Sequence, residues 1–262
     1  MANKGSGSLL ENVKTIVYAL LIALGIRTVA FEPFNIPSGS MIPTLLVGDY
    51  LFVSKYSYGY SRYSLPFSPR LWSGRILGHV PERGDVAVFR LPREPSTNYI
   101  KRIIGLPGDR VQMKSGQLFI NGTLVPRTPA GPYTDSNQYG LAPNKERGFN
   151  KEVSLYGELL PNGRKHDILK LYEKGDVGYR SDANDTQEFN VPQGHVFAMG
   201  DNRDNSQDSR YSYAEGVGFV PLENLVGRAE FIFFSVDATA PWWQVWEWPR
   251  EIRWSRLLHG IS

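Results

Sequence analysis

An almost uninterrupted apolar segment near the N-terminus limits what this chain can fold into more than any other feature. Residues 13–31 are apolar apart from four polar positions, and the run from Ile16 to Ile26 contains no charged side chain. A helix of this length rises about 28 Å, close to the ~30 Å thickness of the hydrocarbon core of a bilayer. The sequence therefore predicts a transmembrane anchor over residues 13–31, after a short N-terminal segment at residues 1–12.

Two other interpretations of this segment stay open from the residues alone. Ala30 offers a small side chain, as at the cleavage point of a secretory signal, and a buried core helix would have a similar composition. Charge gives weak guidance on orientation, because Lys4 and Lys14 precede the apolar run whereas Arg27 follows it.

Beyond the anchor, the sequence predicts short β-strands. They are rich in β-branched and aromatic residues and are bounded by Gly, Pro or Asp. These runs cover residues 49–55, 85–90, 98–104, 110–113, 117–120, 195–199 and 226–234. Asn121-Gly122 predicts a tight hairpin turn between two of them. No alternation of strands with helices is visible, so we predict a mostly β protein with antiparallel sheets.

The composition of the chain changes between residues 126 and 192. Stretches such as PRTPAGPYTDSN (126–137) are polar and rich in turn formers. We interpret residues 126–192 as an inserted, smaller β subdomain, which divides a core domain into residues 32–125 and residues 193–240. Residues 241–262 then form a separate C-terminal tail.

That tail carries a second possible membrane signal. PWWQVWEWPREIRWSRLL (241–258) holds five of the six tryptophans together with Arg250, Arg253 and Arg256. Tryptophan rings and cations suit the bilayer interface, where they meet head groups and anionic lipid. A packed strand followed by a surface helix is the alternative interpretation.

Composition and motifs argue against several classes of protein. A net charge of +3, without RNP, zinc-finger or P-loop patterns, gives no reason to expect a nucleic-acid partner. The lack of cysteine excludes thiol proteases and disulfide scaffolds. The four histidines lack H-E-x-x-H spacing, and GDNRDNSQDSR (200–210) does not fit a calcium loop. We therefore expect no metal and no cofactor.

A serine and a lysine are the candidates for chemistry. Ser40 stands in PSGSMIPTL (37–45) and Lys101 in the apolar segment NYIKRIIG (98–105). Serine is a poor nucleophile until a base takes its proton, and lysine serves as that base only when burial keeps it neutral. Taken singly, each residue has an ordinary alternative, since Ser40 could occupy a simple turn and Lys101 could face solvent on an edge strand.

Four segments together resemble the type I signal peptidase family (peptidase S26). They are PSGSMIPTLLVGDYLFVSK (37–55), RGDVAVF (83–89), YIKRIIGLPGD (99–109) and GDNRDNSQDSR (200–210), in the order of the family. The resemblance implies a membrane-bound endopeptidase that removes signal peptides from exported preproteins, with Ser40 as nucleophile and Lys101 as base. It also implies that the antiparallel β-sheet domain is the catalytic one.

The resemblance assigns roles to further residues. The oxyanion hole would combine the Ser40 backbone N–H with the Ser38 hydroxyl, and Ser206 would hydrogen-bond and orient Lys101. A structural charge network would pair Asp201 with Arg102 and Asp208 with Arg210. The shallow substrate pockets, which would admit small side chains, would be lined by Phe34, Ile36, Pro37, Met41, Leu45, Tyr99 and Ile100. Ordinary core packing is the alternative for those apolar residues.

The resemblance also implies the setting: a bacterial inner (plasma) membrane, crossed once, with residues 1–12 in the cytoplasm and the catalytic domain on the periplasmic or outer face. The expected partners are signal peptides and phospholipid, and the protein is expected to act as a monomer. Alternative functions are a Ser/Lys processing protease of a conjugation or pilus system, a self-cleaving repressor, or a catalytically inactive membrane-anchored β module that binds exported segments. A Ser-His-Asp triad, with His195 as its histidine, is the alternative mechanism.

Overall fold

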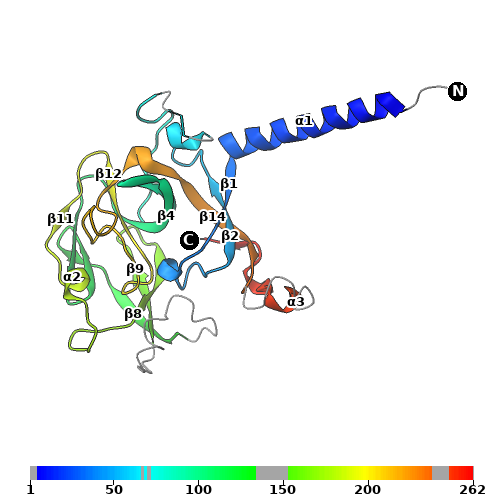
Figure 1. Cartoon of the computed structure of the whole chain (residues 1–262). Helices are drawn as coiled ribbons and strands as arrows, with labels where there is room; N and C mark the ends of the chain where they lie inside the picture. Colours follow the sequence, from blue (N-terminus) through cyan, green and yellow to red (C-terminus); the bar gives the residue numbers. More distant parts are fainter. Residues whose placement is uncertain (1–4, 66–67, 70–71, 134–152, 238–247, 262) are drawn as a thin grey trace.

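A computed structural model describes residues 5–65, 68–69, 72–133, 153–237 and 248–261, and shows one long helix projecting from a body of β-strands (Figure 1). Helix α1 (Gly5–Val29) contains a stretch, Glu11–Val29, that is long and apolar enough to cross a membrane and is not buried by the rest of the protein. The predicted anchor is therefore helical, but Phe31 at its end already belongs to the first strand.

The largest sheet has eight strands, and its pairs are antiparallel. In spatial order they are β1 (Phe31–Asn35), β2 (Asp49–Ser54), β14 (Leu225–Ser235), β3 (Val86–Leu91), β4 (Glu94–Gly105), β12 (His195–Met199) and β13 (Val220–Pro221), with β15 (His259–Gly260) paired to β14. The two parts of the chain on either side of the predicted insertion thus contribute to one sheet. The antiparallel, mostly β fold predicted from the sequence is confirmed.

Two smaller sheets complete the strands. One holds β10 (Lys165–Lys170), β9 (Ser154–Leu159) and β8 (Arg127–Pro132). The other holds β11 (Phe189–Asn190), β5 (Arg110–Lys114), β6 (Gln117–Ile120) and β7 (Thr123–Leu124). Between β6 and β7, Asn121 and Gly122 both have positive φ angles, of 53° and 79°, which confirms the predicted hairpin turn.

The division into domains is less simple than the sequence suggested. The three strands β8 to β10 lie within residues 126–192 and form a sheet of their own. Strand β11 also lies within this range, but it pairs with β5, which belongs to residues 32–125. The domain boundaries given above therefore stay a proposal. Short helical segments connect the strands: η1 (Gly39–Met41), η2 (Arg62–Ser64), α2 (Ser181–Asn184), η3 (Leu222–Asn224), α3 (Trp248–Glu251) and η4 (Trp254–Arg256).

Apolar side chains cover both faces of the large sheet. Along β3, Val86 and Val88 pack into one buried cluster, whereas Ala87 and Phe89 pack into another. Successive side chains of a strand point to opposite faces, so β3 is buried on both sides. Lys101 pairs with Ala87 across the β3–β4 ladder, which places the lysine in the interior of the protein.

Two of the three arginines of the tail, Arg253 and Arg256, do not face outward as expected, whereas Arg250 is exposed. The guanidinium of Arg256 binds the buried Asp49 carboxylate, with its Nε 3.0 Å from Oδ1, and Arg253 donates to the Val47 carbonyl at 3.0 Å. A buried carboxylate requires a paired cation, which explains why these side chains turn toward the sheet. Residues 241–247, with Trp242, Trp243 and Trp246, lie outside the described residues.

Candidate active site

A single helical turn, η1, carries Ser40. Two hydrogen bonds from Asn202 hold this turn: its backbone N–H donates to the Ser40 carbonyl at 3.1 Å, and its side-chain amide donates to the Gly39 carbonyl at 3.0 Å. Ser40 itself is 8% exposed. The serine hydroxyl is therefore presented from a fixed backbone.

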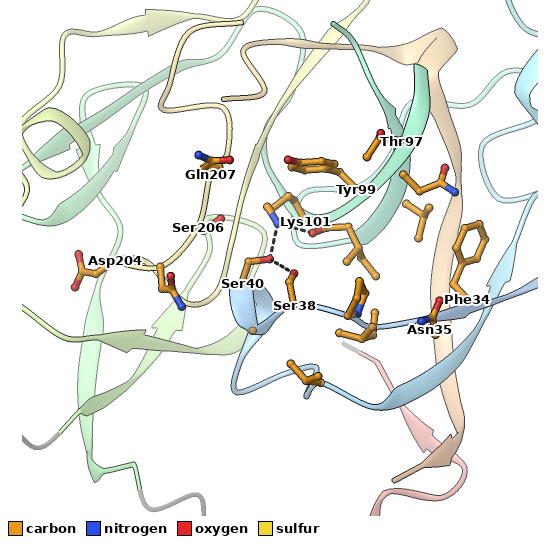
Figure 2. A pocket seen from close by; sticks show the side chains of 18 of the residues that line it. Phe34, Asn35, Ser38, Ser40, Thr97, Tyr99, Lys101, Asp204, Ser206 and Gln207 are labelled. Carbon is orange, nitrogen blue, oxygen red and sulfur yellow. Dashed lines mark hydrogen bonds between the residues drawn. The ribbon is translucent and has the colours of Figure 1, made fainter. Parts of the chain in front are cut away.

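The side chain of Lys101 reaches Ser40 from strand β4 (Figure 2). Its Nζ donates to Ser40 Oγ at 2.6 Å and to the Ile100 carbonyl at 3.0 Å. Lys101 is 3% exposed, and its amine lies 5.4 Å from the centre of the Tyr99 ring. The fold thus joins two residues that are 61 positions apart in the sequence.

The surroundings of Lys101 change its protonation. Burial lowers the pKa of the Lys101 amine from 10.5 to about 8. The carboxylates of Asp208 and Asp201 act in the opposite direction, while Arg210 reinforces the lowering. With a pKa near 8, roughly a tenth of the amines are neutral at pH 7. A neutral amine has the lone pair that can accept a proton from serine, so the site contains a base for near-neutral pH.

Two further serines stand beside the pair. Ser38 Oγ lies 3.4 Å from Ser40 Oγ, at the outer limit of a hydrogen bond. Ser206 lines the same cleft, but the Lys101 amine bonds to Ser40 and to the Ile100 carbonyl instead. The hydrogen bond that the resemblance implied between Ser206 and Lys101 is thus replaced by a bond to the main chain.

Position 200 is a glycine because its backbone packs closely against Ser206 and against the turn that carries Ser40. A Cβ atom on Gly200 would lie 2.3 Å from Ser206 Oγ and 2.5 Å from the Ser40 carbonyl oxygen. Both distances are too short for any side chain, so only glycine lets this segment pack against the serine turn.

Two buried ion pairs form the wall behind Lys101. Arg102 binds Asp201 through two hydrogen bonds of 2.9 and 2.8 Å, and Arg210 binds Asp208 through two of 2.9 Å. Both pairings that the resemblance implied are present. Burial by itself would raise the pKa of Asp201, but Arg102, with smaller contributions from His166 and Thr44, holds that pKa below its usual value.

The segment after β8 contributes residues that the sequence analysis missed. Glu158 on β9 accepts a hydrogen bond of 2.9 Å from Arg203, and Lys170 on β10 donates to Asp204 at 2.8 Å. Thr44 also donates to Asp201, at 2.6 Å. Thr44 lies inside a recognisable motif and could have been singled out, whereas Glu158 and Lys170 stand in a stretch without any motif.

The cleft around the two residues has a volume of about 790 Å³. Of the predicted pocket residues, five line it: Phe34, Ile36, Pro37, Tyr99 and Ile100. Met41 and Leu45 instead lie fully buried in the core beneath the turn, at 0% exposure. The change of direction at η1 carries the chain inward after Ser40, so these two side chains lie in the core rather than in the cleft.

Among the residues that the structure describes, neither a metal centre nor a histidine lines the cleft. Within the described ranges, no group of three or more His, Asp or Glu side chains is arranged to hold a metal ion. The ring of His195 contacts the Gln193 carbonyl at 3.0 Å, and His195 does not line the part of the cleft that the structure describes.

Comparison with known proteins identifies the family. The model of the family described as "Signal peptidase, peptidase S26" matches residues 9–234. The chain is 43% identical over 231 residues to the Signal peptidase I of Rickettsia conorii, covering 87% of this chain and 80% of that protein. It is 39% identical over 260 residues to that of Rickettsia rickettsii, covering 94% and 91%. The chain therefore belongs to the peptidase S26 signal peptidase family, and the resemblance is confirmed.

A solved structure was also found. A signal peptidase I from Enterococcus faecalis V583 is 27% identical and covers 56% of this chain and 95% of that chain, with a TM-score of 0.31.

Burial of the Lys101 amine should cost folding stability. We expect Lys101→Met to raise the free energy of unfolding at pH 7 by up to about 3 kcal/mol, since each pKa unit corresponds to ~1.4 kcal/mol. Between pH 8 and 10.5 the Lys101 amine is neutral in the folded protein but still charged in the unfolded protein, so the free energy of unfolding of the wild type rises with pH. The difference between Lys101→Met and the wild type should therefore become smaller over this range. Urea unfolding of the full chain in detergent measures both effects.

Lys55 provides a matched control. It is also 3% exposed, but its amine binds Glu32 at 2.9 Å and the Ser64 carbonyl at 2.7 Å. Lys55→Met should lower the free energy of unfolding by about 1–3 kcal/mol, because it leaves these acceptors without their donor. If Lys101→Met and Lys55→Met lowered the free energy of unfolding equally, burial of the Lys101 amine would not be destabilising and this prediction would be wrong.

Proposed function

We propose that this protein is a membrane-bound serine endopeptidase that cleaves N-terminal signal peptides from exported preproteins, with Ser40 as nucleophile and Lys101 as general base. The observation that carries the proposal is the 2.6 Å hydrogen bond between Ser40 Oγ and a buried amine whose pKa is lowered to about 8. The substrate class is supported by the relatives, which are named Signal peptidase I.

The reaction begins with the neutral form of Lys101. The amine takes the Ser40 proton as Oγ attacks the scissile carbonyl carbon, which forms a tetrahedral intermediate. The resulting ammonium then protonates the leaving amine, the peptide bond breaks, and the signal peptide is left as an ester on Ser40. Water, deprotonated by Lys101, hydrolyses this ester and regenerates the serine.

Ser38 and the backbone of Ser40 stabilise the oxyanion in this scheme. The extended conformation of Ser38 and its 3.4 Å approach to Ser40 Oγ support a position close to the developing charge. Losing one such donor typically raises the barrier by about 3–4 kcal/mol. Ser206, which lines the cleft beside Lys101, is available to orient the amine once Ser40 has been acylated and no longer binds it.

The apolar side of the cleft selects the residues before the scissile bond. Phe34 and Ile36 come from β1 and the turn after it, and Ile100 from β4, next to the two reacting residues. Shallow apolar walls admit Ala, Gly or Ser and exclude larger side chains by steric overlap. This supports an A-x-A-like preference.

The anchor would hold this site at the bilayer surface. Helix α1 ends at Val29 and β1 begins two residues later, with Ser40 shortly after it. An apolar N-terminal helix of this kind fits a protein of the bacterial inner membrane. We propose a single crossing, with the catalytic domain on the outer face, where the cleavage region of a signal peptide emerges from the bilayer.

Removing either member of the pair should abolish cleavage. Ser40→Ala and Lys101→Ala should each reduce the cleavage of a model preprotein by detergent-extracted protein at least 1,000-fold, because the two residues act as one unit. His195→Ala is the control and should keep near-wild-type activity. Activity above about a tenth of wild type in either dyad variant would refute the pair, and a wild-type protein that cuts no preprotein would favour an inactive binding module.

The pH dependence of kcat/KM should report the base. Only the neutral amine accepts the serine proton, so kcat/KM should rise about tenfold per pH unit up to pH 8 and level off above it. Initial rates at low preprotein concentration between pH 5 and pH 10 measure this profile. An acid limb near pH 6.5 that disappears in His195→Ala would instead identify histidine as the base.

A further inference from the structure

The cleft differs in polarity on the two sides of the serine–lysine pair. Phe34 and Asn35 lie on one side of Ser40, and Asp204 and Gln207 lie on the other (Figure 2). The first side is rich in apolar residues. The second side is polar and also includes Asn205. Arg180 lies on this side, because the side-chain amide of Asn184 donates both to the Arg180 carbonyl at 3.0 Å and to the Asp204 carboxylate at 3.1 Å. An extended peptide crossing the nucleophile therefore passes from an apolar surface to a polar one.

Arg180 gives the polar side a positively charged group that can bind a ligand. Its guanidinium lies 5.1 Å from the centre of the Tyr211 ring, which holds it in place by a cation–π contact. It also pairs with Asp182 at 3.0 Å, but both of these side chains are about half exposed, so that the pair is well screened by water. A guanidinium has five N–H donors, so a carboxylate of a bound peptide can be accommodated as well.

The neighbouring Asp204 does not cancel this positive charge. Its carboxylate accepts hydrogen bonds from Lys170, from Asn184, and from the backbone N–H groups of residues 171 and 172. The 2.8 Å contact with Lys170 neutralises Asp204 within the wall of the cleft. An acidic side chain of a peptide in the cleft is therefore attracted by Arg180 more strongly than it is repelled by Asp204.

We propose that the polar side of the cleft is a subsite for the first residues after the scissile bond, and that Arg180 selects an acidic side chain there. This inference rests on the proposed function, because it assigns the apolar side to the signal peptide and the opposite side to the released chain. The chemistry recognised is a carboxylate on the second or third residue of the mature protein, within a few extended residues of Ser40.

A charge exchange tests this subsite. Model preproteins that carry Asp or Lys at each of the first three mature positions are compared by kcat/KM at low salt. With the wild-type protein, Asp should be favoured over Lys by about three- to tenfold at the second or third position, and 1 M salt should remove most of the difference. Arg180→Gln should abolish the preference, and Arg180→Glu should reverse it.

Arg110 provides the matched control. Its side chain is as exposed as that of Arg180, at 52% against 51%, and it also pairs with a carboxylate, that of Glu188, but it does not line the cleft. Arg110→Glu changes the net charge equally and should keep the wild-type preference. An unchanged Asp-to-Lys ratio in Arg180→Glu, or an equal change in Arg110→Glu, would overturn the subsite.

The same substrates separate this inference from the proposed function. If the wild type cuts none of them, the proposed function fails. The subsite is then decided by binding of the same peptides to Ser40→Ala, measured by fluorescence anisotropy. A Kd for the Asp peptide at least threefold below that for the Lys peptide would support it, and equal Kd values would refute it.

Discussion

The contact between the buried Lys101 amine and Ser40 Oγ is the interaction on which the rest of this structure depends. At 2.6 Å it requires a serine turn and a strand, far apart in sequence, to be held in fixed register. Asn202 fixes the turn through two main-chain bonds, and the β3–β4 ladder fixes the strand. Burial of the amine then lowers its pKa to about 8. Part of the Lys101 population is therefore neutral near pH 7, with a lone pair that can accept a proton.

The charged wall behind the amine makes this state possible. Carboxylates beside a lysine normally stabilise its charged form, and Asp208 and Asp201 do act in that direction. Each of these carboxylates, however, is bound by an arginine through two hydrogen bonds. The positive charge of the arginine offsets the negative charge of the carboxylate, so the carboxylate stabilises the charged form of Lys101 less. The smaller three-stranded sheet supports the same wall, since Glu158 and Lys170 bind Arg203 and Asp204. This part of the chain thus stabilises the site without entering it.

The sequence predicted the parts of the molecule that follow local rules. The apolar helix, the strand runs and the Asn121-Gly122 hairpin depend on neighbouring residues and were recovered, as were the two ion pairs, through the resemblance. Three features depend on the packing of distant segments and were not recovered. Met41 and Leu45 turn into the core, Arg256 turns inward to a buried Asp49, and Lys101 bonds a main-chain carbonyl rather than Ser206. No local pattern encodes such contacts, because each is decided by how distant segments pack: apolar side chains fill the core, and buried polar groups bind whichever partner the packing brings within reach.

Because the fold removes Lys101 from water, its pKa is lowered to about 8, so that about half of the amines are neutral at pH 8. The most direct measurement is an NMR titration of the 13Cε resonance of Lys101 in the full-length, detergent-solubilised protein, assigned by its loss in Lys101→Met. The account predicts a midpoint near pH 8. A midpoint at the ordinary value of about 10.5 would contradict it.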